Sequence, residues 1–219
     1  MKKILLIFLL ASFIKADAQV TEGLVKYSMK QGGNSADISA QMMGNTSVTI
    51  YFKKEKALME MTTPVYSMRT LTDNSGVLML MDAAGQKFFS RKTKEDIAKD
   101  KTDKKTPDPV IVYTNETKKI LGYDCKKAYL TAQGNRGASI KMTIWLTDKI
   151  RNVPGLGPVN AEVLSKLKGM SLEIEMEQNG VTSKMTAIEI SVKPLSDNIF
   201  NLSTNGYTER KLAGASPKK

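Results

Sequence analysis

The stretch MSLEIEMEQNGVTSKMTAIEI, residues 170–190, carries the pattern that decides the fold. Apolar side chains occupy every second position from Met170 to Met176, with Ser or Glu between them. An alternation with period two is typical of a β-strand that buries one face. Asn179-Gly180 then predicts a two-residue hairpin turn, and a second alternating run follows. We therefore expect an antiparallel hairpin with one apolar face.

This turn also predicts the pairing of the two strands. The expected pairs are Ile174 with Met185, Leu172 with Ala187 and, on the opposite face, Glu175 with Lys184. Beyond Ala187 the apolar residues shift to Ile188 and Ile190. A slip of one residue would place the whole apolar set in water. We therefore predict a β-bulge near Ala187 and Ile188, which bends the sheet.

The same alternation recurs along the chain. It is clear in VTIYF (48–52), ALMEM (57–61) and SIKMTIWLT (139–147). Short turn signals such as DNSG (73–76) separate the runs, as in an antiparallel meander. The run from Val77 to Met81 is apolar at every position, which predicts a strand covered on both faces.

Two helices are expected between the strands. The first is TKEDIAKD (93–100), with Thr93 as N-cap and a charged loop, 101–109, after it. The second is NAEVLSKLKG (160–169), with Asn160 as N-cap and Gly169 as terminator, and its shared apolar face consists of Val163, Leu164 and Leu167. The predicted fold is mainly β (α+β): a strongly curved antiparallel sheet, or half-open β-barrel, with one or two short helices across its concave side.

The first eighteen residues predict export. Lys2-Lys3 precede an apolar run from Ile4 to Ile14, and Ala16-Asp17-Ala18 forms a small-x-small cleavage signal. The apolar run is too short to span a bilayer. We expect a signal peptide at 1–18, one curved-sheet domain at 19–207 and a disordered basic tail at 208–219. The mature protein would be periplasmic or held in the cell envelope, and not integral to a membrane.

The charge balance narrows the possible partners. The chain has 33 Lys and Arg against 22 Asp and Glu, a net charge of +11. The lysines are spread out and are not interleaved with aromatic residues, so a nucleic-acid partner is not expected. Two interpretations remain, a solvated surface or peripheral contact with an anionic membrane.

The residue inventory argues against catalysis. The chain has no histidine, which removes the commonest general base and metal ligand. The only cysteine, Cys125, cannot form an intramolecular disulfide, and we expect it to be a small buried apolar residue. We expect no catalytic residues, no metal and no cofactor. Trp145 alternates with the apolar residues of its run, so it is either partly buried under a loop or a contact aromatic.

Methionine is unusually frequent in the predicted strands, and three explanations are open. Methionine fills irregular gaps in cores, forms adaptable walls for variable apolar ligands, and can bind copper(I). The clustered spacing typical of copper sites is missing, with Met42-Met43 as the one tight pair. The candidate ligand-lining residues are Met59, Met61, Met79, Met81, Met142, Ile144, Leu172, Ile174, Met176 and Met185, with Val163, Leu164 and Leu167 as a lid.

Several blocks, in this order, resemble an exported bacterial family, the domain of unknown function 4412. They are VTIYFKKEKALMEM, LMLMDAAGQKFF, KKILGYDCKKAYL, KGMSLEIEMEQNG and SDNIFNLSTNGY, and they span most of residues 20–207. The resemblance implies a fold like that of the LolA/LolB lipoprotein carriers, a half-open barrel that handles acyl chains. It implies no functional residue.

We therefore expect a non-catalytic exported protein that binds an apolar ligand, a lipid or a lipidated polypeptide, in a Met-rich half-barrel. The alternative is an envelope protein-interaction module with a fully packed core. Its partner would contact the outer face or the basic loop from Lys99 to Lys105.

Overall fold

One sheet of twelve strands forms the body of the protein. The structure, a computed structural model, describes residues 19–33, 46–103, 108–133, 139–153, 166–178 and 181–210. The strand order is β12-β6-β5-β4-β3-β2-β1-β11-β10-β9-β8-β7. The strands are β1 (Glu22–Gly33), β2 (Ser47–Lys53), β3 (Lys56–Thr62), β4 (Tyr66–Asp73), β5 (Gly76–Ala83), β6 (Gln86–Thr93), β7 (Val110–Ile120), β8 (Tyr123–Gln133), β9 (Ser139–Thr147), β10 (Met170–Gln178), β11 (Val181–Ser191) and β12 (Thr208–Glu209).

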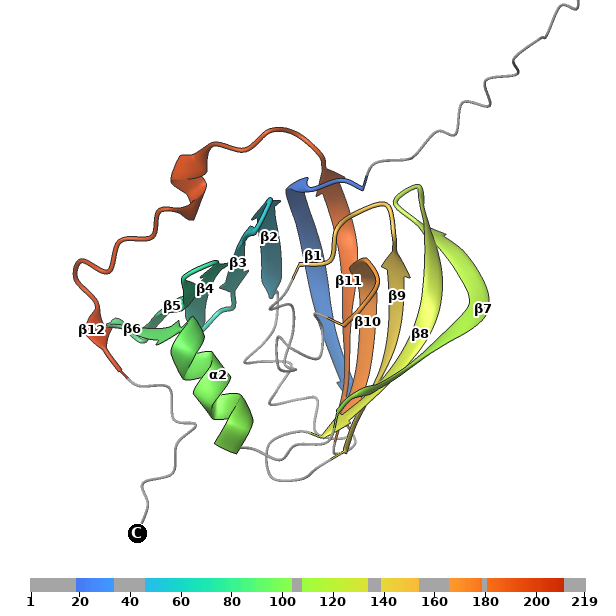
Figure 1. Ribbon diagram of the computed structural model, residues 1–219, viewed down its shortest axis with the longest axis horizontal. Helices are drawn as coiled ribbons and strands as arrows, with labels where there is room; N and C mark the ends of the chain where they lie inside the picture. The colour runs from blue at the N-terminus through green and yellow to red at the C-terminus, as the bar shows by residue number, and fades with distance from the viewer. Residues whose placement is uncertain are drawn as a thin grey trace, which may run out of the picture.

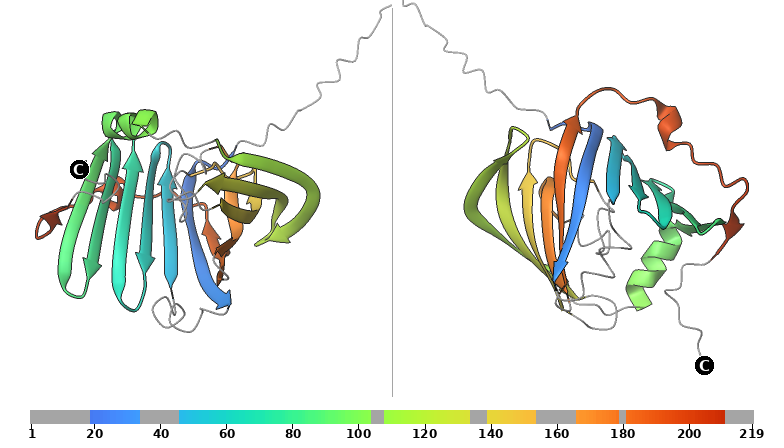
Figure 2. Two further views of the ribbon diagram at one scale, coloured as in Figure 1. Left: turned by 90° about the horizontal axis from the view of Figure 1, so that it is seen from below. Right: turned by 180° about the vertical axis from the view of Figure 1, so that it is seen from behind.

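The sheet bends between β1 and β2 into two wings. The first wing consists of β2 to β6 with β12, and the second of β1 and β7 to β11 (Figure 1). Seen from other sides, the second wing curls strongly while the first is a flatter meander (Figure 2). The predicted curved sheet, mainly β, is confirmed. Every strand pair is antiparallel except β12 with β6, which is parallel.

The predicted hairpin pairing holds in the β10–β11 ladder. Ile174 lies opposite Met185 and Glu175 opposite Lys184. This ladder begins at the pair Glu173–Thr186, so the expected Leu172–Ala187 pair lies just beyond it, and the turn residues 179–180 lie outside the described residues.

The predicted bulge is also confirmed. In the β1–β11 ladder, Lys26 pairs with Glu189 and Tyr27 with Ala187, so Ile188 is the extra residue. Further irregularities occur between β9 and β10, where Leu172 is extra, and between β7 and β8. All three belong to the second wing, whereas the described ladders of the first wing run without a shift. Because bulges increase local twist, this distribution explains why the second wing curls.

The first predicted helix is present and longer than expected. Thr93 caps helix α2 (Lys94–Asp103). Its Oγ1 accepts a hydrogen bond from the Asp96 backbone N–H at 3.2 Å. The Asp96 carboxylate accepts in return from the Thr93 backbone N–H at 3.1 Å, a reciprocal cap. The helix continues three residues into the predicted loop, so Lys99 to Asp103 are helical. Within the described residues α2 is the one α-helix.

The second predicted helix is not observed where the chain is described. Residues 160–165 lie outside the described residues, and 166–168 form a turn and bends. Gly169 follows with φ +132°, and a Cβ atom there would overlap the carbonyl oxygen of Thr147. Gly169 was predicted to end a helix. The structure instead requires glycine there because β10 approaches β9 closely at this point.

The C-terminal segment after β11 crosses the convex face of the first wing (Figure 1). Lys53 holds its start, because its Nζ donates to the Leu195 carbonyl at 2.7 Å. The 3-10 helix η2 (Asp197–Phe200) follows and buries Phe200. The segment ends in β12, and the Arg210 N–H donates to Phe89 O. The first residues of the predicted tail, 208–210, thus pack on the domain, and 211–219 lie outside the described residues.

The main core lies on the concave side of the bend, where β2 of the first wing meets β1 and the other strands of the second wing. Val25, Tyr27 and Ile50 are buried there with Leu130 and Ile144 from the opposite strands. The Tyr27 hydroxyl donates to Ser171 O at 2.9 Å, which satisfies its polar end in the interior. No helix among the described residues has the length and apolar character needed to cross a membrane.

Candidate functional site: the apolar concave face

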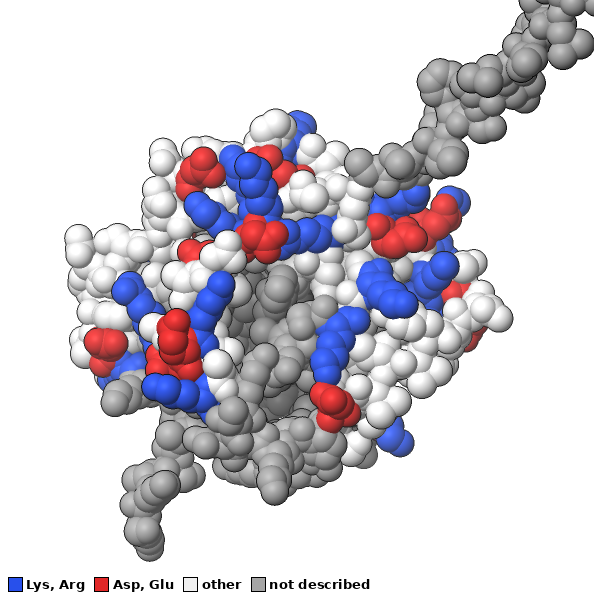
Figure 3. Space-filling view, in the orientation of Figure 1, with Lys and Arg blue, Asp and Glu red and all other residues white. Residues whose placement is uncertain are grey.

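The concave side of the first wing carries two rows of side chains that run across the strands. Cross-strand partners point to the same face of a sheet, so the register defines each row. One row is Val48, Met61, Met68, Met81 and Phe88, and the other is Ile50, Met59, Thr70, Met79 and Ser90. Figure 3 views the molecule from the side on which the two wings face each other. We call these two rows, from β3 to β6, the methionine face.

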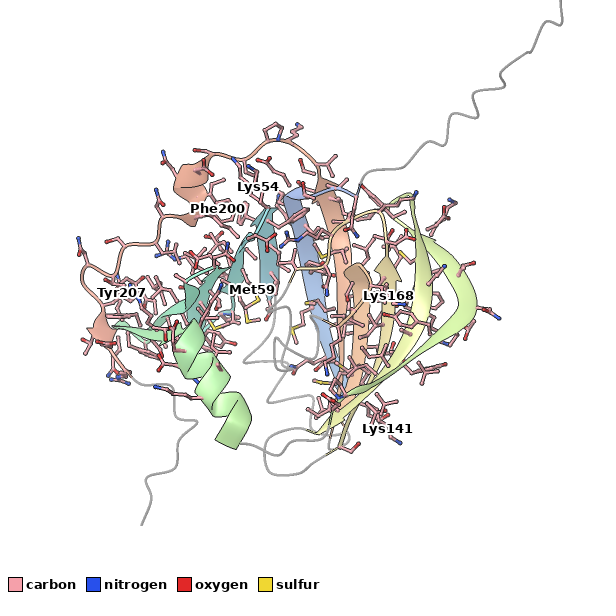
Figure 4. All side chains as sticks on the ribbon, in the orientation of Figure 1. Lys54, Met59, Lys141, Lys168, Phe200 and Tyr207 are labelled. Carbon is pink, nitrogen blue, oxygen red and sulfur yellow. The ribbon has the colours of Figure 1, made fainter. Side chains whose placement is uncertain are left out.

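The methionine face is apolar and remains partly exposed. Val48 and Ile50, next to the bend, are 1% exposed, whereas the five methionines and Phe88 are all partly exposed. On the opposite face of the same strands, Leu58 and Leu80 are 1% exposed. Figure 4 shows Met59 on the side of the space between the wings and Phe200 on the outer side. Leu71 and Leu78, on the same convex face, are partly exposed, as the concave methionines are.

This burial pattern corrects one expectation. The run from Val77 to Met81 was predicted to be covered on both faces. Leu80 is buried, but Met79 and Met81 are partly exposed. Leu78, which shares the convex face with Leu80, is partly exposed too, so neither face of this strand is fully covered.

The predicted lining residues of the second wing divide into two groups. Met176 and Met185 are partly exposed, and they lie on the concave side through their partners Met142 and Ile174. The remaining ones are packed into the core, with exposed fractions of 5% or less: Met142, Ile144, Leu172 and Ile174. A ligand cannot reach these four in the described arrangement, so they support the wall and do not line it.

Of the three predicted lid residues, the structure describes only Leu167. Val163 and Leu164 lie outside the described residues. Leu167 is 4% exposed within the core, and its carbonyl accepts a hydrogen bond from Asn152 Nδ2 at 3.0 Å. Leu167 is therefore a core residue that anchors the segment before β10.

Sequence reasoning missed two apolar members of the methionine face. Met68 lies between Met61 and Met81, and Phe88 ends the same row at β6. Met68 shares its parity with Tyr66 in the run VYSMRTL, so alternation alone could have found it. Phe88 stands beside Phe89, and only the register tells which of the two faces inward.

Charged side chains lie on both wings in the view of Figure 3. Glu55, in the turn between β2 and β3, pairs with Arg151 Nη1 at 2.7 Å. Asp108, just before β7, pairs with Lys166 at 2.6 Å. Lys54, in the β2–β3 turn, and Lys168, before β10, are exposed and are labelled in Figure 4. Glu55 and Asp108 are therefore already neutralised by neighbouring cations.

Trp145 lies on the convex side of the second wing, away from the methionine face. It is partly buried beneath Lys118, whose Nζ lies 4.3 Å from the ring centroid. Lys118 also donates to Glu173 Oε1 at 2.7 Å, and Lys184 lies 3.2 Å from the same atom. Burial alone would raise the pKa of the Glu173 carboxyl, but its bonds to the two lysines outweigh burial and hold that pKa below its ordinary value. Trp145 is thus part of an ion-pair cluster.

Cys125 is buried as expected, with 0% of its surface exposed. Burial raises the pKa of the thiol to about 11. The thiolate is the reactive form of cysteine, so at neutral pH this side chain is an inert packing group. Within the described ranges, no three side chains of the His, Cys, Asp and Glu types gather as metal ligands.

Comparison with solved structures places the fold. A structure of PNGF-II is similar over 88% of this chain and 32% of its own, with 16% identity and a TM-score of 0.51. This chain thus spans about a third of the length of PNGF-II. Two further structures are more distant. LprF from Mycobacterium bovis is 13% identical over 80% of this chain and 88% of its own, with a TM-score of 0.37. A LolA superfamily protein from Nitrosomonas europaea is 13% identical over 85% of this chain and 94% of its own, with a TM-score of 0.38. At these identities the likeness concerns the fold alone.

The family model gives the assignment. No curated protein matches the chain. The model of the domain of unknown function DUF4412 matches residues 35–202, which include β2 to β11 and η2. The match covers well over half of the sequence, including the strands of the methionine face. The chain therefore belongs to the DUF4412 family.

Proposed function

We propose that this protein is a non-catalytic exported binding protein that holds an apolar ligand, a lipid or a lipidated polypeptide, in a half-barrel formed by its two wings. The ligand lies against the methionine face of the first wing, with Met176 and Met185 on the opposite wall. The signal peptide predicted at 1–18 would deliver the protein to the periplasm or cell envelope.

One observation carries the proposal: five methionines and Phe88 lie together on the concave side of the first wing and are partly exposed. Apolar side chains that remain in water forfeit about 25 cal/mol for each Å² left exposed. On the convex face Leu58 and Leu80 escape this cost, and η2 contacts β3 there, while Leu71 and Leu78 are partly exposed. The concave methionines are all partly exposed as well. An apolar ligand would complete the burial.

The choice of side chain supports the same conclusion. Methionine has three rotatable side-chain bonds and a polarisable sulfur, so a methionine wall adapts to ligands of different shape. Selectivity in such a site comes from shape and apolar area, as in most small-molecule pockets.

The proposal is tested by placing a charge on the methionine face. We expect Met61→Asp to weaken binding of a fluorescent fatty acid by about tenfold or more, because a desolvated carboxylate opposes apolar burial. Thr62→Asp is the matched control: Thr62 is the next residue of β3, is exposed, and points to the opposite face. The control should bind like the unmodified protein. Equal loss in both variants, or no binding by the unmodified protein, would contradict the proposal.

A second candidate function has one observation in its favour. At the β7 edge of the sheet, Val110 and Val112 are 60% and 54% exposed, and Tyr129, opposite Val112, is 44% exposed. Exposed apolar groups at a sheet edge are typical of protein-interaction surfaces. If this edge is the functional surface, protein purified from an envelope fraction should show a ligand-free mass by native mass spectrometry.

A further inference from the structure

We propose that the methionine face also binds a soft monovalent metal ion, copper(I) or silver(I), through the thioether sulfurs around Met68. This inference goes beyond the proposed function, because it concerns the sulfur atoms of these side chains and not their apolar area. The spacing of methionines along the sequence gives no such site. The register of the sheet assembles it from three strands.

Three methionines follow one another on adjacent strands in one row of the methionine face. Met61 of β3 lies opposite Met68 of β4, and Met68 lies opposite Met81 of β5. Cross-strand partners have Cβ atoms about 4.5–5.5 Å apart, and a thioether sulfur lies two bonds beyond its Cβ. Neighbouring sulfurs of this row can therefore reach one ion.

Two further methionines flank this row. Met59 and Met79 lie two residues from Met61 and Met81 on the same strands, and side chains two residues apart point to the same face of a sheet. Met68 thus has two methionines on each neighbouring strand. Either pair can complete a site with three sulfurs.

No second row of this kind occurs among the residues that the structure describes. In the second wing Met29 pairs with Met185 and Met142 with Met176, but no third methionine continues either row. Met142 is also only 3% exposed, whereas the methionines around Met68 are all partly exposed. The first wing is therefore where the described chain offers most thioether sulfur to an ion from solution.

The chemistry of thioether sulfur selects the ion. Thioethers are soft ligands that suit copper(I) and silver(I), whereas calcium and magnesium prefer oxygen. The Tyr66 hydroxyl donates to Met61 Sδ at 3.5 Å, so a lone pair on this sulfur is accessible to a polar group. A thioether has no proton to lose when a metal binds, in contrast to a thiol.

The test is titration of the protein with silver(I) in chloride-free buffer, followed by calorimetry and native mass spectrometry. We expect a tight silver site that calcium and magnesium do not occupy. Its affinity should be the same at about pH 5 and pH 8, because no coordinating group titrates, whereas a thiol site would bind more tightly as the pH rises. These measurements require no variant. Absence of silver binding, or a thiol-like pH dependence, would overturn the inference.

Met68→Leu should weaken the tightest silver site by about tenfold or more, because Met61 and Met81 then lie two strand spacings apart, about 9.5 Å. Leucine conserves the apolar volume, so the fluorescent fatty acid should bind to this variant as it does to the unmodified protein. Unchanged silver affinity in Met68→Leu would overturn the inference.

Two controls address the other sulfur atoms of the chain. Met42→Leu with Met43→Leu removes the tight pair in the sequence, and Cys125→Ala removes the only thiol. Both should bind silver like the unmodified protein, and loss of the site in either would overturn the inference. Silver binding without fatty-acid binding by the unmodified protein would contradict the proposed function alone. Fatty-acid binding without silver binding would contradict the metal site alone.

Discussion

At the scale of single residues, the first wing separates leucine from methionine. The four leucines of β3 to β5 face the convex side, where Leu58 and Leu80 are buried and Leu71 and Leu78 partly exposed, and the methionines face the concave side. Leucine has few well-defined rotamers and suits a permanent, tightly packed contact. Methionine tolerates a changing contact because its side chain is unbranched.

A residue-scale prediction concerns Gly169. We expect Gly169→Ala to lower the free energy of unfolding by about 2 kcal/mol or more, because a Cβ would overlap Thr147 O and φ +132° is strained for alanine. Gly32→Ala is the control, since no heavy atom lies within 4 Å of a Cβ at that position. Urea denaturation measures both. Equal midpoints for the two variants would contradict the close-approach explanation.

At the scale of elements, the bulges account for the difference between the wings. Ile188 and Leu172 each add one residue to a strand of the second wing. Ile188 is 57% exposed, so the extra residue is directed into solvent while Ala187 and Ile190 keep their places on the concave side. Bending the second wing in this way turns Met176 and Met185 toward the methionine face.

The ion-pair cluster on β10 gives an element-scale prediction for pH. The pKa of the Glu173 carboxyl lies below its ordinary value of 4.5, because Lys118 and Lys184 stabilise the carboxylate. A lowered pKa contributes stability that is present above the unfolded pKa and is lost as the pH falls through the folded value. We expect Glu173→Gln to cost about 1–2 kcal/mol at pH 7 and progressively less below pH 4.5.

The single tryptophan provides the measurement for this cluster. Trp145 lies beside Lys118, so its fluorescence reports unfolding and the loss of the cluster together. Glu177→Gln, an exposed acid on the same strand, should show the stability of the unmodified protein throughout. A difference between the Glu173 variant and the unmodified protein that stays constant with pH would contradict the assigned role of the carboxylate.

At the scale of the whole molecule, the C-terminal segment decides which face of the first wing is available. It begins at the Lys53 contact, buries Phe200 to 3% exposure and ends beside β6. Arg69 Nη2 donates to the Tyr207 hydroxyl at 3.4 Å along its course. Because β12 pairs with β6, the segment also covers one of the two edges of the sheet, and β7 forms the other.

Removal of the Phe200 side chain should loosen this cover. We expect Phe200→Ala to lower the free energy of unfolding by about 3 kcal/mol and to increase binding of an apolar dye to the native protein. Asn201→Ala, an exposed neighbour, should do neither. If dye binding stays unchanged although stability falls, Phe200 packs locally and does not seal the convex face.

Much of the architecture follows from local patterns in the sequence. Alternation predicted the strands, Asn179-Gly180 predicted the Ile174–Met185 pairing, and the parity change predicted the bulge at Ile188. These features depend on neighbours in the chain or across one hairpin, so a single sequence contains them. The mainly β class could be predicted for the same reason. The DUF4412 family could be recognised from the blocks quoted above and their order along the chain.

The tertiary structure decided which apolar side chains remain exposed to solvent. By sequence, Met142 and Met61 look alike, since each alternates with polar residues in a strand. Met142 is 3% exposed in the core, whereas Met61 is partly exposed on the methionine face. The difference depends on contacts between segments far apart in the chain, above all the bend at β1–β2 and the C-terminal segment over Leu58 and Leu80. Burial is a property of the whole assembly of elements, and no local pattern can specify it.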